Sequence, residues 1–346
     1  MRRILKYMFA IALLLLPCTA KAVETGEVDV PEIIFGHIGD AYEWHITDIG
    51  DKAVAIHLPV IVYGKNTGLQ VFSSRHLGHG GTYKGFRIAG PGEKYEGKVV
   101  MEDGSRPFDI SITKNVLSLM MSSALLLVIV LLTARWYRRH DVMVESPKGI
   151  AAFMEPLLMM VHDMARENIG EEDYRKYSPF LCMVFLFILL NNFMGIIPFF
   201  PGGANLTGNI AVTLVLALST FLMVNLFGNK HYYKDIFWPD VPIFLKAPIP
   251  VMPVIEVFSS IMKPVSLTIR LFANMLAGHI LLLSLVCVIF IMAKYGPGLL
   301  GSMSVVSVLF GIFMDMLECL VAFIQAYVFT MLSSIYIGLS RQKAEE

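Results

Sequence analysis

The segment from Lys263 to His279 reads KPVSLTIRLFANMLAGH and decides the fold of this chain. It lies inside an apolar region, residues 254–292, that is longer than the roughly 20 residues that cross a bilayer as a helix. An arginine, Arg270, stands near the middle of this region. Such an arginine costs from about 3 to over 10 kcal/mol, so it is normally functional or paired, and a snorkelling or salt-bridged side chain is the structural alternative. The segment contains four polar groups in seventeen residues, which indicates the lining of a polar path. They are Lys263, Arg270, Asn274 and His279.

The composition indicates a membrane protein. Of 346 residues, 55% are hydrophobic and only 16% are charged, and the mean hydropathy is +0.63. Several apolar segments reach the length of a membrane helix, which predicts an all-α polytopic membrane domain over residues 114–346. The formal net charge is zero, so no nucleic-acid partner is expected. Three of the four cysteines lie in apolar helical segments and the fourth, Cys18, lies near the N-terminus, so no disulfide framework is expected.

Residues 1–22 have the pattern of a secretory signal peptide. Three basic residues precede the apolar run Met8–Leu16, and the small-residue pattern Ala20–Ala22 follows. An uncleaved anchor is the alternative. The chain is therefore expected to begin outside the cytoplasm at residue 23.

Residues 23–113 predict a small β-rich exterior domain. Polar and apolar residues alternate between glycine, asparagine and aspartate, as in short strands. The predicted strand stretches are Ala53–Tyr63, Leu69–Ser73, Gly85–Ala89, Gly97–Met101 and Phe108–Ile112. Five of the nine histidines lie in this domain, but their spacing fits no strong zinc pattern, so no metal is expected.

The remaining chain predicts about five membrane crossings. A charged amphipathic stretch, residues 147–168, predicts a helix on the cytoplasmic face. Arginines after the first crossing place that end in the cytoplasm, which puts the mature N-terminus outside and the C-terminus inside. The predicted crossings are Asn115–Thr133, Pro179–Phe200, Ile210–Phe227, residues 254–292 and Val305–Leu339, with loops at Asn229–Lys246 and Lys294–Gly301.

Helical periodicity sorts the polar residues into separate faces. Arg270 and Asn274 are one turn apart, and Glu318 and Gln325 are two turns apart, so each pair shares a face. His279 is nine residues from Arg270, which places it on the opposite side of the helix and roughly 13–14 Å away along the axis. The two sides of this helix therefore serve different purposes.

The quoted segment resembles the signature of the a subunit of F-type ATP synthases, and similar pieces continue from about residue 115 to 338. The resemblance implies a stator protein of the bacterial inner membrane that carries protons through two half-channels to a rotating ring of c subunits. Its other partners would be b-type peripheral stalk subunits and the rest of the ATP synthase. The last two long helices would form a strongly tilted hairpin facing that ring.

The resemblance also assigns candidate residues for proton translocation. The family has ionisable residues at the positions of His279 and Glu318, commonly in the opposite order, and this exchange predicts that the two side chains meet. Asn209 corresponds to a position near the outer half-channel, although a helix N-cap is an equal alternative. Glu256 lies seven residues before Lys263, on the same helix face, near the expected cytoplasmic exit.

Arg270 has a role that follows from its chemistry. A guanidinium is never deprotonated in a protein, so Arg270 cannot relay protons. It can attract a carboxylate on a passing rotor helix and favour release of that carboxylate's proton.

The chain itself has no expected nucleotide site or cofactor, because it carries no P-loop pattern. It would be a non-catalytic subunit of an enzyme. A secondary transporter or ion channel with an intramembrane Arg/His/Glu pathway is the alternative from another class. The absence of an internal sequence repeat counts against it.

Overall fold

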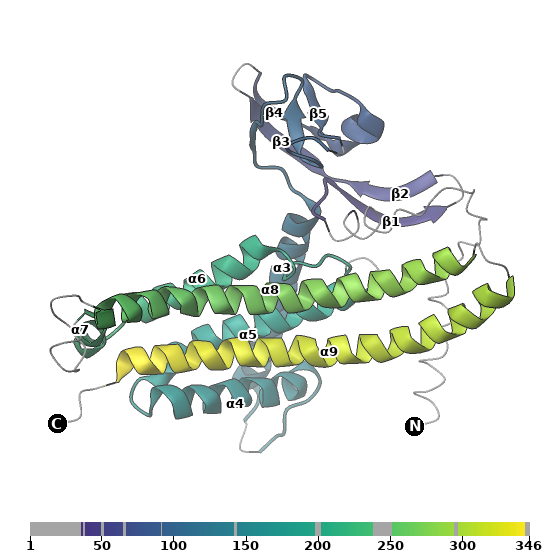
Figure 1. Ribbon diagram of the computed structural model, residues 1–346. Coiled ribbons are helices and arrows are strands. Elements are labelled where there is room, and N and C mark those ends of the chain that lie inside the picture. The colour runs from purple at the N-terminus through teal and green to yellow at the C-terminus, as the bar shows by residue number, and fades with distance from the viewer. Residues whose placement is uncertain are drawn as a thin grey trace.

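The computed structural model (Figure 1) has a small β-rich domain standing above a bundle of long helices. It describes residue 36 and residues 39–49, 52–64, 67–90, 92–141, 144–197, 202–237, 251–293 and 297–342. The predicted signal peptide, residues 1–22, lies outside the described residues. The fold confirms the predicted class, a mostly helical polytopic membrane protein with small sheets near the N-terminus.

The described part of the N-terminal domain, between residues 39 and 113, contains three small antiparallel sheets. The first pairs β1 with β2, the second has the strand order β4-β3-β7, and the third pairs β5 with β6. The strands are β1 (Glu43–Ile49), β2 (Lys52–His57), β3 (Pro59–Gly64), β4 (Gly68–Ser73), β5 (Phe86–Ile88), β6 (Val99–Met101) and β7 (Phe108–Asp109), with a 3₁₀ helix η1 (Ser74–Gly80). Their shared core contains Tyr42, Val60, Val62, Phe72, Leu77, Phe86 and Val99.

The predicted β stretch Ala53–Tyr63 forms parts of two strands, β2 and β3, which are separated at Leu58. The Leu58 N–H donates to the carbonyl of Tyr42 at 3.2 Å, and the Leu58 carbonyl accepts from the Ser74 N–H at 2.9 Å. The buried Leu58 therefore passes the chain from the sheet of β1 and β2 to the sheet of β3 and β4.

Within the described residues, four helices are long and apolar enough to cross a membrane, and a fifth crossing arises if α6 and α7, which meet at 102°, count as one broken span. The helices are α3 (Lys114–Arg139), α4 (Ile150–Ile169), α5 (Tyr174–Ile196), α6 (Ile210–Leu226), α7 (Lys230–Phe237), α8 (Val251–Ala293) and α9 (Pro297–Arg341). The amphipathic helix predicted over residues 147–168 is present as α4.

Two predicted loops are partly helical. Residues 230–237, predicted as loop, form α7, whose Tyr232 is buried against the bundle. The loop predicted at Lys294–Gly301 is shorter than expected, because α9 already begins at Pro297. Proline is well tolerated in the first turn of a helix, where its missing N–H has no intrahelical partner to lose.

The pair of helices α8 and α9 dominates the membrane domain. They have 43 and 45 residues, and Figure 1 shows them side by side over their lengths. At about 1.5 Å per residue each is about 65 Å long, roughly twice the hydrocarbon thickness of a bilayer. The predicted long hairpin is therefore confirmed, and it fits a bilayer only when strongly tilted.

The helix α5 lies at the centre of the bundle, and 56% of its 18-residue apolar stretch is buried. The Asn192 side-chain amide donates to the Ala322 carbonyl of α9 at 3.0 Å.

The end of α9 is held by two contacts. Arg341 Nη2 lies 2.7 Å from Asp173 Oδ2 beside the start of α5, and the Ser340 carbonyl accepts from the Asn229 N–H at 2.8 Å. These contacts hold the last turn of α9 against the α4–α5 and α6–α7 connections.

Gly338 lies where α9 approaches the end of α4 closely. A Cβ at this position would collide with the carbonyl oxygen of Asn168. We expect Gly338→Ala to lower the free energy of unfolding by about 1–3 kcal/mol, as overpacking does. Thermal unfolding of the purified chain in detergent measures this effect.

The matched control is Gly311→Ala in the same helix, where the nearest atom to a new Cβ is Leu285 Cδ2 at 3.7 Å. This change is expected to be neutral or to stabilise by up to about 1 kcal/mol through helix propensity. Equal effects of the two substitutions would contradict the packing at Gly338.

Candidate functional site

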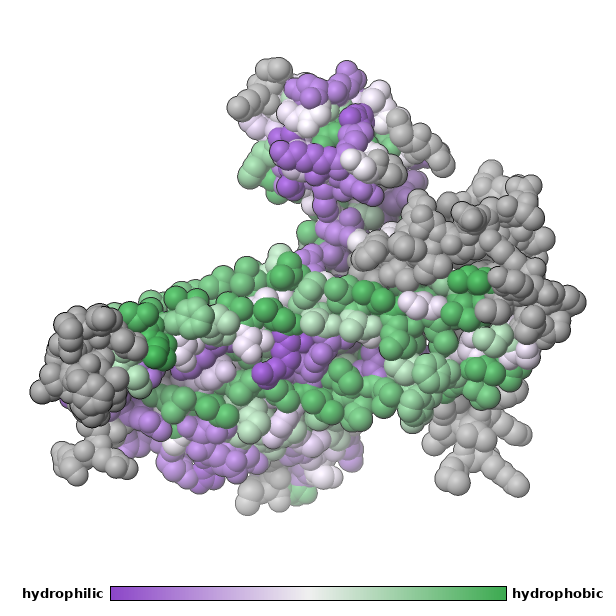
Figure 2. Space-filling model, viewed as in Figure 1, coloured by the Kyte–Doolittle hydropathy of each residue, from purple (hydrophilic) through white to green (hydrophobic). Residues whose placement is uncertain are grey.

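The paired helices α8 and α9 present a surface that is mostly apolar but carries a hydrophilic patch near its middle (Figure 2). On α8 the exposed polar residues of the central turns include Arg270 and Asn274, which share a face as predicted. On α9 the exposed charged residue nearest the middle is Asp315. Sequence reasoning left Asp315 out of the candidate site, although a carboxylate three residues before Glu318 in an apolar helix was a usable signal.

His279 and Glu318 are in contact between α8 and α9, as the sequence predicted. His279 Nδ1 lies 2.8 Å from Glu318 Oε1, and the exposed fractions of the two side chains are 16% and 6%. Nδ1 of His279 and both carboxylate oxygens of Glu318 are buried and have no hydrogen-bond partner among the described residues. The two side chains are therefore in close contact at a mostly buried position, and the contact is an ion pair only when the imidazole is protonated.

The other ring nitrogen of His279 determines what this contact requires. His279 Nε2 lies 3.2 Å from the Gly195 carbonyl oxygen, which can only accept, so Nε2 carries a hydrogen. In a neutral imidazole Nδ1 is then an unprotonated acceptor facing the carboxylate. The contact is favourable when one additional proton resides on either partner, so the pair is suited to hold and exchange a proton.

Gly278 allows the carboxylate to approach α8. A Cβ at Gly278 would lie only 2.9 Å from Glu318 Oε1, so any larger residue must displace the carboxylate. Gly195 approaches from α5, where a Cβ would lie 3.7 Å from His279 Cε1, an ordinary contact. Three helices therefore enclose the pair.

The remaining predicted residues lie apart from this pair. Gln325 is buried two turns along α9 from Glu318. Lys263 lies 16 residues before His279 on α8, about 24 Å along the axis, with Nζ 5.4 Å from the centre of the Tyr336 ring. Glu256 is half-buried two turns earlier in α8. Asn209 caps α6, since its Oδ1 accepts from the Ala211 N–H at 3.0 Å, as the N-cap interpretation predicted.

Additional buried polar atoms were missed by sequence reasoning. Side-chain oxygens without a hydrogen-bond partner among the described residues occur at the first turn of α3, in the last turns of α5 and in the loop before α6. They belong to Thr113, Asn115, Asn191, Asn192 and Thr207. Polar residues within apolar runs were the available signal, but their burial depends on the packing of other helices.

The described residues contain no group of three or more histidine, cysteine, aspartate or glutamate side chains able to hold a metal ion. His57 and His76 are exposed, and His57 Nδ1 lies 3.7 Å from Glu43 Oε2.

Comparisons with known proteins divide the chain into two parts. Residues 118–338 match the family described as ATP synthase A chain, and residues 33–118 match a family described only as a domain of unknown function. ATP synthase subunit a of Chlorobium phaeobacteroides (strain DSM 266 / SMG 266 / 2430) is 42% identical over 244 residues, which cover 69% of this chain and 67% of that protein. ATP synthase subunit a of Myxococcus xanthus (strain DK1622) is 38% identical over 239 residues, covering 67% and 73% respectively.

The contact of His279 with Glu318 predicts energetic coupling. We expect the double substitution His279→Ala with Glu318→Ala to differ from the sum of the single effects by about 0.5–3 kcal/mol, because each single change leaves the other group buried without its partner. Thermal unfolding in detergent measures the cycle. The control cycle pairs Arg270→Ala with Glu318→Ala and should be additive within about 0.5 kcal/mol. Additivity in the first cycle would disprove the contact.

Proposed function

The chain belongs to the ATP synthase A chain family, and we propose that, as a membrane-sector subunit of F-type ATP synthase, it carries protons to and from a rotating ring of c subunits. It does so through two half-channels, one from each side of the bacterial inner membrane. The N-terminal domain lies on the exterior side, and the C-terminus lies in the cytoplasm. The c ring and b-type peripheral stalk subunits are its direct partners within the complex.

The observation that carries this proposal is the division of α8 into two chemically different sides. His279 faces inward to Glu318, where a proton can be exchanged. Arg270 faces outward from the bundle, among exposed apolar residues such as Ile269. A fixed cation on an apolar outer surface is suited to meet a carboxylate on a neighbouring membrane helix.

The unpartnered buried oxygens support an exterior half-channel. Leaving a buried polar atom without a partner costs about 1–3 kcal/mol, and buried water normally satisfies such atoms. Five of these atoms lie at the start of α3 (Thr113, Asn115), before α6 (Thr207) and near the end of α5 (Asn191, Asn192), where Gly195 contacts His279. Water bridging them would connect the exterior to Glu318. Asn209 and Gln325 extend this polar lining.

A small cavity beside Lys263 supports a cytoplasmic half-channel. This cavity of about 10 Å³, the size of one water molecule, is lined by Thr220, Ser260, Lys263 and Tyr336 among apolar residues. Glu256 lies two turns from Lys263 on the same helix. These groups line the exit from the rotor to the cytoplasm.

Arg270 separates the two half-channels. Because its charge is permanent, it favours the ionised state of a rotor carboxylate that arrives opposite it and opposes the direct passage of protons. Asn274, one turn away on the same face, adds a polar contact to this carboxylate. Each proton that crosses 100 mV supplies about 2.3 kcal/mol, so several crossings must be summed by rotation.

The alternative of a secondary transporter or independent ion channel is not favoured, because family membership makes the chain part of F-type ATP synthase. ATP chemistry then belongs to other subunits of the complex.

We expect Arg270→Ala to abolish proton-driven ATP synthesis in membrane vesicles while the complex still assembles, because no fixed charge then releases the rotor proton. Ser266→Ala, one turn earlier on the exposed side of α8, is the control and should retain synthesis. Normal ATP synthesis by the assembled Arg270→Ala complex would rule out this role.

The exchange His279→Glu with Glu318→His is expected to recover activity that either single substitution removes, because the pair again holds one shared proton. ATP synthesis in vesicles, with assembly measured in the same preparation, provides the readout. Equal loss in the two single variants and the exchanged variant would contradict a shared proton site.

A further inference from the structure

We propose that the N-terminal domain forms the mouth of the exterior half-channel, with the Asp40 carboxylate as the charged group at its entrance. This inference rests on the proposed function. It assigns a role to a domain whose own family carries no described function.

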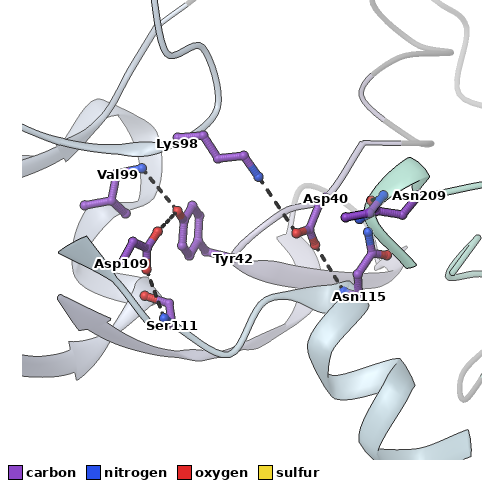
Figure 3. Close-up of polar contacts among 9 residues, drawn as sticks. Asp40, Tyr42, Lys98, Val99, Asp109, Ser111, Asn115 and Asn209 are labelled. Atoms are coloured by element: carbon purple, nitrogen blue, oxygen red, sulfur yellow. Dashed lines mark hydrogen bonds and ion pairs between the residues drawn. The ribbon is translucent and has the colours of Figure 1, made fainter. Parts of the chain in front are cut away.

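The N-terminal domain is joined directly to the first turn of α3. Asp40 Oδ1 accepts a hydrogen bond from the Asn115 N–H at 3.1 Å, and the Ala41 carbonyl accepts from the Lys114 N–H at 2.8 Å (Figure 3). Both contacts satisfy N–H groups that the start of a helix leaves free. The position of Asp40 is therefore fixed relative to the membrane helices.

Asp40 lies among groups from three parts of the fold. Lys98, in the turn before β6, places Nζ 3.8 Å from Asp40 Oδ2, and the side chain of Lys114 adds a second positive charge nearby. Tyr42 also faces this region, but burial and its hydrogen bond to Asp109 raise its pKa, so it stays neutral. The Asp40 side chain remains 21% exposed and can contact water.

Unpartnered polar atoms continue inward from this carboxylate. Asn115, whose backbone binds Asp40, is more than nine-tenths buried, and its side-chain Oδ1 has no hydrogen-bond partner among the described residues. Thr113 Oγ1, two residues earlier, is also buried and has no hydrogen-bond partner among the described residues. In Figure 3 the side chain of Asn209, at the start of α6, lies beside that of Asn115. Asp40 thus stands at the outer end of the series of polar atoms assigned to the half-channel.

A carboxylate in this position has a definite effect on proton supply. Its negative charge offsets the positive charges of Lys98 and Lys114, which would otherwise repel hydrated protons from the mouth. One unit charge about 6 Å away in water changes a cation's local concentration by about threefold. The effect matters when protons are scarce on the exterior side.

The experiment uses the complete ATP synthase with the substitution Asp40→Asn, reconstituted in vesicles. The rate of ATP synthesis is measured at a fixed membrane potential. Asparagine can still accept the hydrogen bond of the Asn115 N–H, so the junction is kept while the charge is removed. We expect ATP synthesis to fall about threefold at high pH on the domain side, where proton uptake limits the rate, and to be unchanged at low pH. Varying the pH on the opposite side should give the wild-type dependence.

Asp103→Asn is the matched control, because it removes an exposed carboxylate from another turn of the same domain. It should match the wild type at every pH. A rate loss in Asp40→Ala with none in Asp40→Asn would mean that Asp40 only caps α3, and this would overturn the proposal. So would a loss in Asp40→Asn that does not depend on the pH of the domain side. The proposed function is tested separately with the Arg270→Ala complex. ATP synthesis coupled to proton flow in that complex would contradict the proposed function, whatever the result at Asp40.

Discussion

A histidine and a glutamate in contact inside an apolar helical bundle impose the constraint on which the rest of the structure depends. A buried carboxylate is costly unless a partner lies close, and His279 is that partner. The contact needs α5, α8 and α9 to approach closely, with the Gly195 carbonyl orienting the imidazole and Gly278 leaving room for the carboxylate. The buried helix α5 lies on the inner side of the pair, where its Gly195 contacts His279.

The length of α8 and α9 solves a second physical problem. A helix that crosses a bilayer directly offers about 20 residues, but these helices have 43 and 45. Their tilt extends the apolar outer surface far beyond a simple crossing, and in the proposed function this surface would face the rotating ring. The same helix α8 carries Arg270 on its exposed outer side and His279 on its inner side, so the permanent charge lies apart from the His279–Glu318 contact.

The N-terminal domain has its own small core, yet its backbone continues into α3 through hydrogen bonds at Ala41 and Asp40. This junction fixes a partly exposed carboxylate at the first turn of α3. In the proposed function, the domain would therefore influence how protons enter the membrane region, while the His279–Glu318 pair stays within the helices.

The sequence by itself determined the class of the protein, the main apolar helices and the faces on which their polar residues lie. Helical periodicity is a local property, so the common face of Arg270 and Asn274 and the opposite position of His279 could be predicted without tertiary information. The sequence missed α7 and the early start of α9, because the stability of a short helix depends on packing such as that of Tyr232. Only the tertiary structure decided which polar groups are buried, including Asn115, Thr207 and Asn191, because burial depends on what other segments of the chain pack against each atom.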